Sequence, residues 1–306
     1  MPEHTDLWSD YWSKEGAGGE VFVDAAGQKH PDITAFWAQF AATLEPGQTI
    51  VDVGCGAGSV FQSFADAAAD HVLIGLDTSP TALTLLAEQV PNAQGMVMTD
   101  DAWPLDAAHA DVVVSQFGIE YASDVTEAFK KAAELMKPEG QLVCLAHCRG
   151  GHIDQIITPQ YEGAKAALDT GFARSAMLLV KTKAEGPEGA HVAAREAFKV
   201  AERRFVERMR NAQTGVHIHL YGGFRHMFQN WDNYSPEDIT QWLIDMEKEM
   251  EIAVGRLGAM RDAAMDVEQL ETIKAAFSEH GITFKFAEFN TSTADTPVAW
   301  SIRASR

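Results

Sequence analysis

Short, almost wholly apolar segments that alternate with helical segments constrain the fold of this chain more than any other feature. They cover residues 49–54 (TIVDVG), 71–77 (HVLIGLD), 95–99 (GMVMT), 111–117 (DVVVSQF) and 141–147 (QLVCLAH). Strands that have no polar face must be covered by helices on both sides. Because helical segments lie between them in the chain, the pattern predicts an α/β domain with a doubly wound parallel sheet.

The helices between these strands carry their own start signals. We expect them over residues 60–69, 79–89 and 123–137. Ser79 stands at the N-cap of the second, and Pro80 occupies its first turn. Asp124 and Glu127 have the spacing of a capping box at the start of the third, which we expect to stop at the turn 137–140, before the fifth strand.

After the fifth strand the alternation stops and a long helical stretch follows. Residues 150–265 have mainly helical periodicity, with breaks expected at Pro159, Gly171, Gly186–Pro187 and Gly222–Gly223. Alternation resumes with a helix over 267–280 and strands over 282–290 and 298–304.

The chain therefore divides into three predicted parts. Residues 1–45 form an N-terminal helical segment over the carboxyl edge of the sheet, and residues 46–149 and 266–306 form the α/β domain. Residues 150–265 form a helical insertion, a lid over the carboxyl edge of the sheet, between strand five and the last helix.

The first strand leads into a glycine-rich turn, Asp52-Val53-Gly54-Cys55-Gly56-Ala57-Gly58, and then into a helix. Glycine permits both the tight bend and the close approach of a ligand. The second strand ends at Asp77, which lies about 20 residues beyond the first glycine, the offset of an acid that holds ribose hydroxyls. Strand, glycine turn, helix, strand and acid in this order predict an adenosine-containing ligand.

The glycine spacing favours one such ligand over another. The dinucleotide fingerprint needs a glycine or alanine where this chain has Ser59, and the third glycine falls one residue earlier, at Gly58. This spacing disfavours a NAD-dependent oxidoreductase.

The segment VDVGCGAG resembles the first motif of class I S-adenosylmethionine (SAM)-dependent methyltransferases, and GLDTSPTAL resembles their second motif. The segments MTDDAWPLDAAHADVVVSQF and AAELMKPEGQLVCLA resemble their later motifs, although Glu139 replaces a common glycine. The resemblance covers residues 48–147 and 266–303. It implies a seven-stranded Rossmann-like sheet with antiparallel strands six and seven, SAM as cofactor and S-adenosylhomocysteine (SAH) as its product.

The resemblance also implies a set of cofactor contacts. Asp52 would lie under the methionine end, Asp77 would bind the ribose, and either Asp100 or Asp101 would meet the adenine amino group. The predicted cofactor-binding residues are Asp52, Gly54, Cys55, Gly56, Gly58, Asp77, Thr78, Asp100, Asp101, Gln116 and Phe117.

Methyl transfer from a sulfonium depends mainly on alignment and water exclusion, so a general base is needed only if the acceptor arrives protonated. The ends of strands four and five face the methyl group in such a sheet. The candidate catalytic residues there are Glu120, Tyr121 and His147. His147 is either a base, since the ordinary pKa of histidine is near neutrality, or a hydrogen-bonded structural residue. Glu120 is a base, a partner of a substrate ammonium group, or a solvated loop carboxylate.

An aromatic and histidine-rich stretch, residues 216–234, supplies candidate contacts for the methyl acceptor. They are His219, Tyr221, Phe224, His226 and Trp231. An aromatic wall with polar tips suits a small-molecule pocket, and the alternative is the core of a helical lid. The histidine spacing matches no zinc motif, so no metal is expected. Tyr11 and Trp12 would either fold over the cofactor or pack on the lid.

Composition narrows the function further. The net charge of −20 opposes a phosphate backbone, so nucleic acid is not an expected partner. No apolar run is long enough to span a membrane. The acidic, aromatic N-terminus lacks the features of a signal peptide, and none of the three cysteines forms a CxxC pair, so we expect a cytoplasmic protein.

The leading hypothesis is a methyltransferase that acts on a small-molecule acceptor. The alternatives are a methyltransferase that acts on a macromolecule and a non-catalytic SAM-binding regulator. A homodimer is left open as a further partner.

Overall fold

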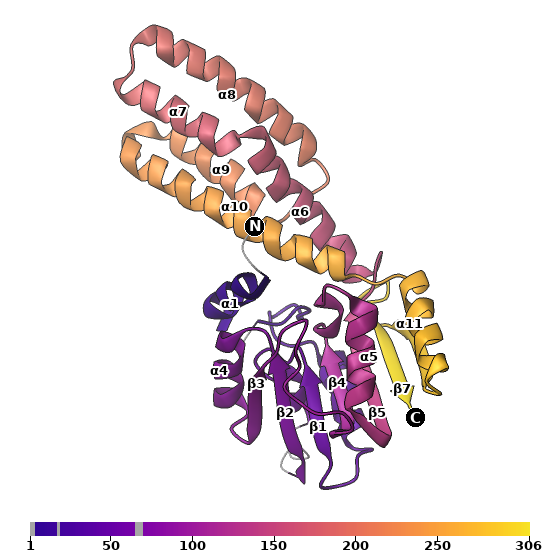
Figure 1. Cartoon of the computed structure of the whole chain (residues 1–306). Coiled ribbons are helices and arrows are strands. Elements are labelled where there is room, and N and C mark those ends of the chain that lie inside the picture. Colours follow the sequence, from indigo (N-terminus) through magenta and orange to yellow (C-terminus); the bar gives the residue numbers. More distant parts are fainter. Residues whose placement is uncertain (1–3, 17–18, 65–69) are drawn as a thin grey trace. The chain divides into compact units, whose positions relative to one another are not determined.

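A seven-stranded sheet forms the centre of the α/β domain in the computed structural model, which describes residues 4–16, 19–64 and 70–306 (Figure 1). The strand order is β3-β2-β1-β4-β5-β7-β6. β1 to β5 run parallel, and β7 is antiparallel to both of its neighbours, β5 and β6. The strands are β1 Thr49–Val53, β2 Val72–Asp77, β3 Ala93–Val97, β4 Ala110–Gln116, β5 Met136–His147, β6 Thr283–Phe289 and β7 Ala299–Ser305. The predicted Rossmann-like methyltransferase sheet is confirmed.

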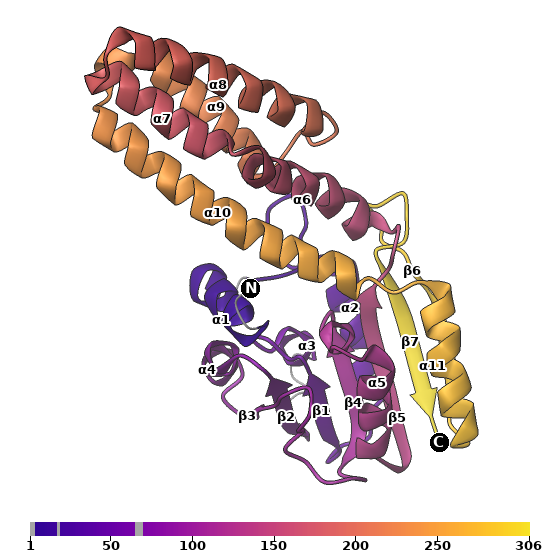
Figure 2. The same cartoon turned by 45° about the horizontal axis from the view of Figure 1, so that its top comes forward.

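Helices cover this sheet as its apolar strands require. They are α1 His4–Glu15, α2 Pro31–Ala41, α3 Ser59–Ser63, α4 Pro80–Gln89, η3 Ile119–Tyr121, α5 Val125–Leu135 and α11 Val267–Glu279. α5 and α11 pack together, and Phe129, Phe277 and Phe284 meet edge to face in the core beneath them. Figures 1 and 2 both show these two helices side by side.

The predicted helix caps form. The Ser79 hydroxyl accepts a hydrogen bond from the Ala82 amide, and the Asp124 carboxylate accepts one from the Glu127 amide. Asp266, not predicted as a cap, begins α11 with a complete capping box. These caps satisfy amides that have no partner within the helix, so they fix where each helix starts.

Two element boundaries differ from prediction. α5 ends at Leu135, and β5 already begins at Met136, which pairs with Ala110. The turn 137–140 therefore forms an irregularity within the strand rather than a connection before it. The helix expected over 60–69 is observed as the short α3, and residues 65–69 lie outside the described residues.

The chain forms two compact units, Met1–Asp154 with Asp262–Arg306, and Gln155–Arg261. The second, the helical unit, contains most or all of α6 His152–Thr170, α7 Phe172–Glu185, α8 Glu188–Arg208, α9 Val216–Gln229, η4 Trp231–Asn233 and α10 Pro236–Ala263. Buried phenylalanines hold it together: the ring of Phe172 lies 5.4 Å from that of Phe198 and 4.9 Å from that of Phe205. No helix among the described residues is long and apolar enough to cross a membrane.

The helix breaks in this unit were only partly predicted. Gly171, with a φ of 64°, separates α6 from α7, and Gly186–Pro187 separates α7 from α8, as expected. The break predicted at Pro159 is wrong, because this proline lies inside α6. A proline removes one i→i−4 hydrogen bond, and burial of Ile157 and Ala164 on either side keeps the helix continuous.

The break predicted at Gly222–Gly223 is also wrong, and the two glycines differ in their surroundings. Both lie within α9. A Cβ on Gly223 would lie 2.6 Å from the Trp242 ring of α10, whereas a Cβ on Gly222 would meet nothing within 4 Å. Gly223 therefore serves close helix packing, which periodicity alone does not reveal.

This difference predicts opposite effects for two neighbouring substitutions. Gly222→Ala should raise the free energy of unfolding by about 0.5–1 kcal/mol, because alanine is the better helix former and the site is open. Gly223→Ala should lower it, because its methyl group displaces the Trp242 ring. Urea unfolding of both variants measures the difference, and equal effects would contradict the packing role.

Candidate functional site

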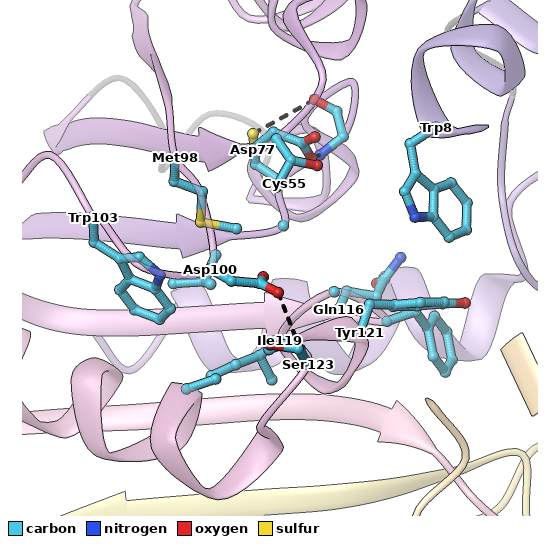
Figure 3. A pocket seen from close by; sticks show the side chains of 18 of the residues that line it. Trp8, Cys55, Asp77, Met98, Asp100, Trp103, Gln116, Ile119, Tyr121 and Ser123 are labelled. Atoms are coloured by element: carbon cyan, nitrogen blue, oxygen red, sulfur yellow. Dashed lines mark hydrogen bonds between the residues drawn. The ribbon is translucent and has the colours of Figure 1, made fainter. Parts of the chain in front are cut away.

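A cavity opens in the α/β unit at the carboxyl ends of β1, β2 and β4 (Figure 3). Open α/β sheets bind ligands at this edge. Predicted residues that line it are Gly54, Cys55, Gly56, Asp77, Thr78, Asp100, Asp101, Gln116, Phe117 and Tyr121. Lining residues that the sequence did not indicate include Glu20, Ser59, Met98, Trp103, Ile119 and Lys131.

The glycine turn is bent by left-handed backbone. Gly54 and Gly56 have φ values of 70° and 52°. A Cβ on Gly54 would lie 2.6 Å from the Gly118 Cα, so glycine is required where the turn passes this backbone. Gly58, with a φ of 87°, does not line the cavity, and a Cβ there would lie 2.6 Å from Leu86. Gly54 and Gly56 thus line the cavity, whereas Gly58 allows close packing against Leu86.

The Asp77 carboxylate ties this turn to the end of β2. Its Oδ2 accepts a hydrogen bond from the Gly56 amide at 2.8 Å, and its Oδ1 accepts one from the Ser79 amide at 2.8 Å. Burial raises the pKa of Asp77, while these amides favour its charged form and oppose the rise. The carboxyl group lines the cavity, where the sequence predicted a ribose partner.

Asp52 lies beneath the turn rather than in the cavity wall. Its side chain is fully buried. Burial, and then the neighbouring charge of Asp77, raise the pKa of Asp52 well above its usual range. The charge of Lys29 opposes this rise, and Asp52 is not among the described residues that line the cavity.

One end of the cavity combines apolar side chains with acids. Met98, Trp103 and Ile119 lie there together with Asp100 (Figure 3). Asp100 accepts a hydrogen bond from the Ser123 amide at 3.2 Å. Asp101 lines the cavity as well, so both acids predicted near the adenine remain candidates.

The opposite end carries a polar network around Gln116. The Trp37 indole N–H donates to Gln116 Oε1 at 2.6 Å. The Gln116 amide group donates to the Ser59 hydroxyl at 3.2 Å, and that hydroxyl donates to Glu20 at 2.7 Å. Trp37 and Glu20 lie far from the glycine turn in sequence, and no motif marks them.

Aromatic residues of α1 also line the cavity. They are Trp8, Tyr11 and Trp12. The Trp8 ring lies 4.9 Å from that of Tyr121, edge to face. A Cβ on Gly56 would lie 2.5 Å from the Trp12 ring, so this indole packs directly on the glycine turn.

His147 and Tyr121 form a pair beside the end of β4. The Tyr121 hydroxyl lies 2.8 Å from His147 Nε2, and the Phe117 ring packs on the imidazole at 4.8 Å. His147 is only 2% exposed, and burial lowers its pKa to about 3. Of the two alternatives for His147, a base or a hydrogen-bonded structural residue, this burial favours the second. Tyr121 lines the cavity, and His147 lies behind it.

Glu120 is placed in the interior. It is 3% exposed, its Oε1 accepts a hydrogen bond from the His147 amide at 2.8 Å, and burial raises its pKa to about 7. It is not among the described cavity-lining residues. This position supports the loop that carries Tyr121 and does not present the carboxylate to a ligand.

The residues predicted to contact the methyl acceptor lie in the helical unit, where they pack against or hydrogen-bond to other residues of that unit. Phe224 is 1% exposed and packs 5.3 Å from Phe198, which fits a core position. Tyr221 accepts a hydrogen bond from Arg225 at 2.9 Å. The rings of His219, His226 and Trp231 contact Trp242, Tyr234 and Phe228 respectively. A role for these residues in acceptor binding stays a prediction.

Within the described residues, no group of three or more histidine, cysteine, aspartate or glutamate side chains could hold a metal ion.

The burial of His147 predicts a pH effect on stability. The unfolded state binds a proton on this ring below about pH 6.5, and the folded state does so only near pH 3. Stability should therefore fall as the pH drops from about 6.5 to 3, with a contribution of up to about 1.4 kcal/mol per pH unit. Free energies of unfolding of the wild type and His147→Gln across this range give the contribution by difference.

The raised pKa of Glu120 acts in the opposite direction between about pH 4.5 and 7. Because both proteins contain Glu120, its contribution cancels in the difference. A His147 imidazole that titrates near pH 6.5 in an NMR titration of the folded protein would contradict the prediction.

Comparison with known proteins identifies the α/β domain. Residues 51–144 match the methyltransferase domain family. A ubiquinone/menaquinone biosynthesis C-methyltransferase of Caulobacter vibrioides is 29% identical over 34% of this chain and 46% of its own length. A malonyl-[acyl-carrier protein] O-methyltransferase of Erwinia billingiae is 31% identical over 33% of this chain and 40% of its length. The matched part of the chain thus spans less than half the length of these curated relatives.

A solved plantazolicin methyltransferase in complex with a monoazolic desmethylPZN analog and SAH is 10% identical, with a TM-score of 0.49 over 100% of this chain and 90% of the other. The matched residues 51–144, the observed strand order and the glycine turn together identify the α/β unit as a methyltransferase domain with the class I sheet.

Proposed function

We propose that this protein binds SAM in the cavity of the α/β unit and transfers its methyl group to a small-molecule acceptor. The observation that carries the proposal is the Asp77 carboxylate, which is fixed by two backbone amides and faces the cavity beside the glycine turn. A charged acceptor in this place suits the two hydroxyls of a ribose.

The residues present fit the remaining parts of the cofactor. Met98, Trp103 and Ile119 offer apolar surface to an adenine ring, and Asp100 or Asp101 accepts from its amino group. The aromatic residues of α1 would exclude water from the cavity. When bound, SAM supplies a methyl group activated by its positive sulfur, so the protein contributes mainly alignment and desolvation.

A small acceptor fits the acidic character of the chain better than a nucleic acid. The net charge of −20 repels a phosphate backbone. Tyr121 is the only one of the three predicted catalytic residues that lines the cavity in the described part of the chain, so it is the one proposed to contact the acceptor. His147, held neutral, would position its hydroxyl.

Two alternative functions, a non-catalytic SAM-binding regulator and a methyltransferase that acts on a macromolecule, can be told apart from this proposal by experiment. A regulator would bind SAM without forming SAH in the presence of any acceptor, and a macromolecular acceptor would be methylated where small molecules are not. The three cysteines are free and buried, which supports the proposed cytoplasmic location. A homodimer is also proposed, and gel filtration would test it by measuring the apparent mass of the protein in solution.

The cofactor assignment predicts the effect of Asp77→Asn. Loss of the charged acceptor should raise the dissociation constant of SAH about ten- to a hundredfold, corresponding to roughly 1.5–3 kcal/mol. Isothermal titration with SAH, SAM and NAD measures it, and the wild type should bind the first two. Asp111→Asn is a matched control, because Asp111 also accepts a backbone amide bond, from Thr49, but does not line the cavity. Unchanged SAH affinity in Asp77→Asn would refute the ribose assignment.

The acceptor assignment predicts the effect of Tyr121→Phe. A screen of amines, phenols, thiols and carboxylates with SAM first identifies an acceptor. With that acceptor, the variant should lose about a hundredfold or more in kcat if the hydroxyl handles the acceptor proton. Its SAH affinity should stay within about twofold, since the phenyl ring keeps the contact with Trp8. An unchanged kcat would show that the Tyr121 hydroxyl has no role in methyl transfer.

A further inference from the structure

The cavity contains a carboxylate that the glycine motifs do not account for. Glu20 comes from the segment between α1 and α2, outside the matched residues 51–144, yet it lines the cavity beside Gly54 and Gly56. Its two oxygens receive hydrogen bonds from the Ser59 hydroxyl at 2.7 Å and, more weakly, from the Gln116 amide group at 3.5 Å.

The polar network fixes the direction in which each of these groups donates. The indole of Trp37 is fully buried and donates to Gln116 Oε1, so the nitrogen of that amide must face Ser59 and Glu20. The Ser59 hydroxyl accepts from Gln116 and therefore directs its own proton to Glu20. The Glu20 carboxyl group is thus held in a fixed orientation at the cavity wall, as the acceptor at the end of this network.

The charged groups around Glu20 leave a place for a cation inside the cavity. Lys29 lies behind this corner, where its ammonium group donates to the Ser59 carbonyl and the Ser63 hydroxyl and interacts electrostatically with Glu20 from the side away from the cavity, which it does not line. Lys131, the one lysine or arginine among the described lining residues, donates to the carbonyls of Asp100 and Asp101 at the other end. The corner at Glu20 is therefore acidic on its cavity side.

Asp52 does not line the cavity at this corner, although the family resemblance placed it under the methionine end. Its carboxyl group is fully buried beneath the turn and does not reach the cavity. Figure 3 shows Met98, Trp103 and Asp100 on one side, Gln116 on the other, and Asp77 near the glycine turn. A ligand whose adenine lies against Trp103 and whose ribose lies at Asp77 would extend its amino-acid end toward Gln116 and Glu20.

We infer that Glu20 binds the α-ammonium group of the cofactor's methionyl portion, with Ser59 and Gln116 as positioning residues. This inference rests on the proposed function. It means that the segment between α1 and α2 completes the cofactor site and selects for an amino-acid-bearing nucleoside. A charge-assisted hydrogen bond between ammonium and carboxylate would supply that selectivity.

The test compares two proteins with three ligands. Dissociation constants of the wild type and Glu20→Gln are measured for SAH, for the SAH analogue that lacks only the α-amino group, and for methylthioadenosine, which lacks the whole amino-acid end. Glu20→Gln should weaken SAH binding about ten- to a hundredfold. It should leave the affinities for the other two ligands unchanged within about twofold.

Asp101→Asn provides the matched control, because it removes a cavity-lining carboxylate at the opposite end. Its effect on SAH and on methylthioadenosine should be equal, so the ratio of the two affinities stays at the wild-type value. A changed ratio in Asp101→Asn would show that the cavity's general charge, and not Glu20, recognises the ammonium group.

The remaining outcomes are equally decisive. Equal loss for all three ligands in Glu20→Gln would assign Glu20 a structural role and overturn the inference. Unchanged SAH affinity in this variant would overturn it as well, while leaving the proposed function intact. A wild type that binds neither SAH nor methylthioadenosine would overturn both.

Discussion

The hydrogen bond from the Gly56 amide to the Asp77 carboxylate joins the ends of β1 and β2, and the geometry of the cavity depends on it. The left-handed backbone of Gly54 and Gly56 carries the turn away from the sheet, and Asp77 draws it back toward β2. The amides of Gly54 and Cys55 both donate to the Leu76 carbonyl, so the turn is held from two successive residues of that strand. A side chain at Gly54 would strike Gly118, which couples the turn to the end of β4 as well.

Burial of acids around this turn gives the cavity its electrostatic character. Asp52 lies under the turn with a raised pKa, which limits the repulsion that two ionised carboxylates, Asp52 and Asp77, would otherwise exert on each other. Asp77, whose charged form is favoured by two amides, and Glu20, bonded by Ser59 and Gln116, are the carboxyl groups of the wall around the turn. A ligand with positive charge at its sulfur and its ammonium group matches such a wall, to which Glu20 adds a carboxyl group from outside the sequence motifs.

The features that could be predicted from the sequence are those determined by short stretches of neighbouring residues. The apolar runs gave five parallel strands in the correct chain order, and Ser79 and Asp124 marked helix starts, because these signals act over a few residues. The glycine turn and Asp77 were found for the same reason. Trp37 and Glu20 were missed, since their role comes from contacts with Gln116 and Ser59 that are distant in sequence. The choice between a base and a structural residue at His147 stayed open, because a sequence does not show how deeply an imidazole is buried.

The end of β4 shows how backbone geometry can separate a titratable group from a ligand. Phe117 adopts a φ of 51°, unusual for a residue with a side chain, while its amide still donates to the Leu145 carbonyl. This conformation accompanies a ring that packs on His147 and a turn into η3, which returns Tyr121 to the same imidazole. A neutral imidazole can accept the phenol proton at Nε2, and the lone pairs of the phenol oxygen are then available to a hydrogen-bond donor in the cavity. Because His147 lies behind Tyr121 and burial lowers its pKa to about 3, the imidazole is a poor proton acceptor and acts as a hydrogen-bond partner of the phenol, so the hydroxyl and not the histidine is the group that lines the cavity.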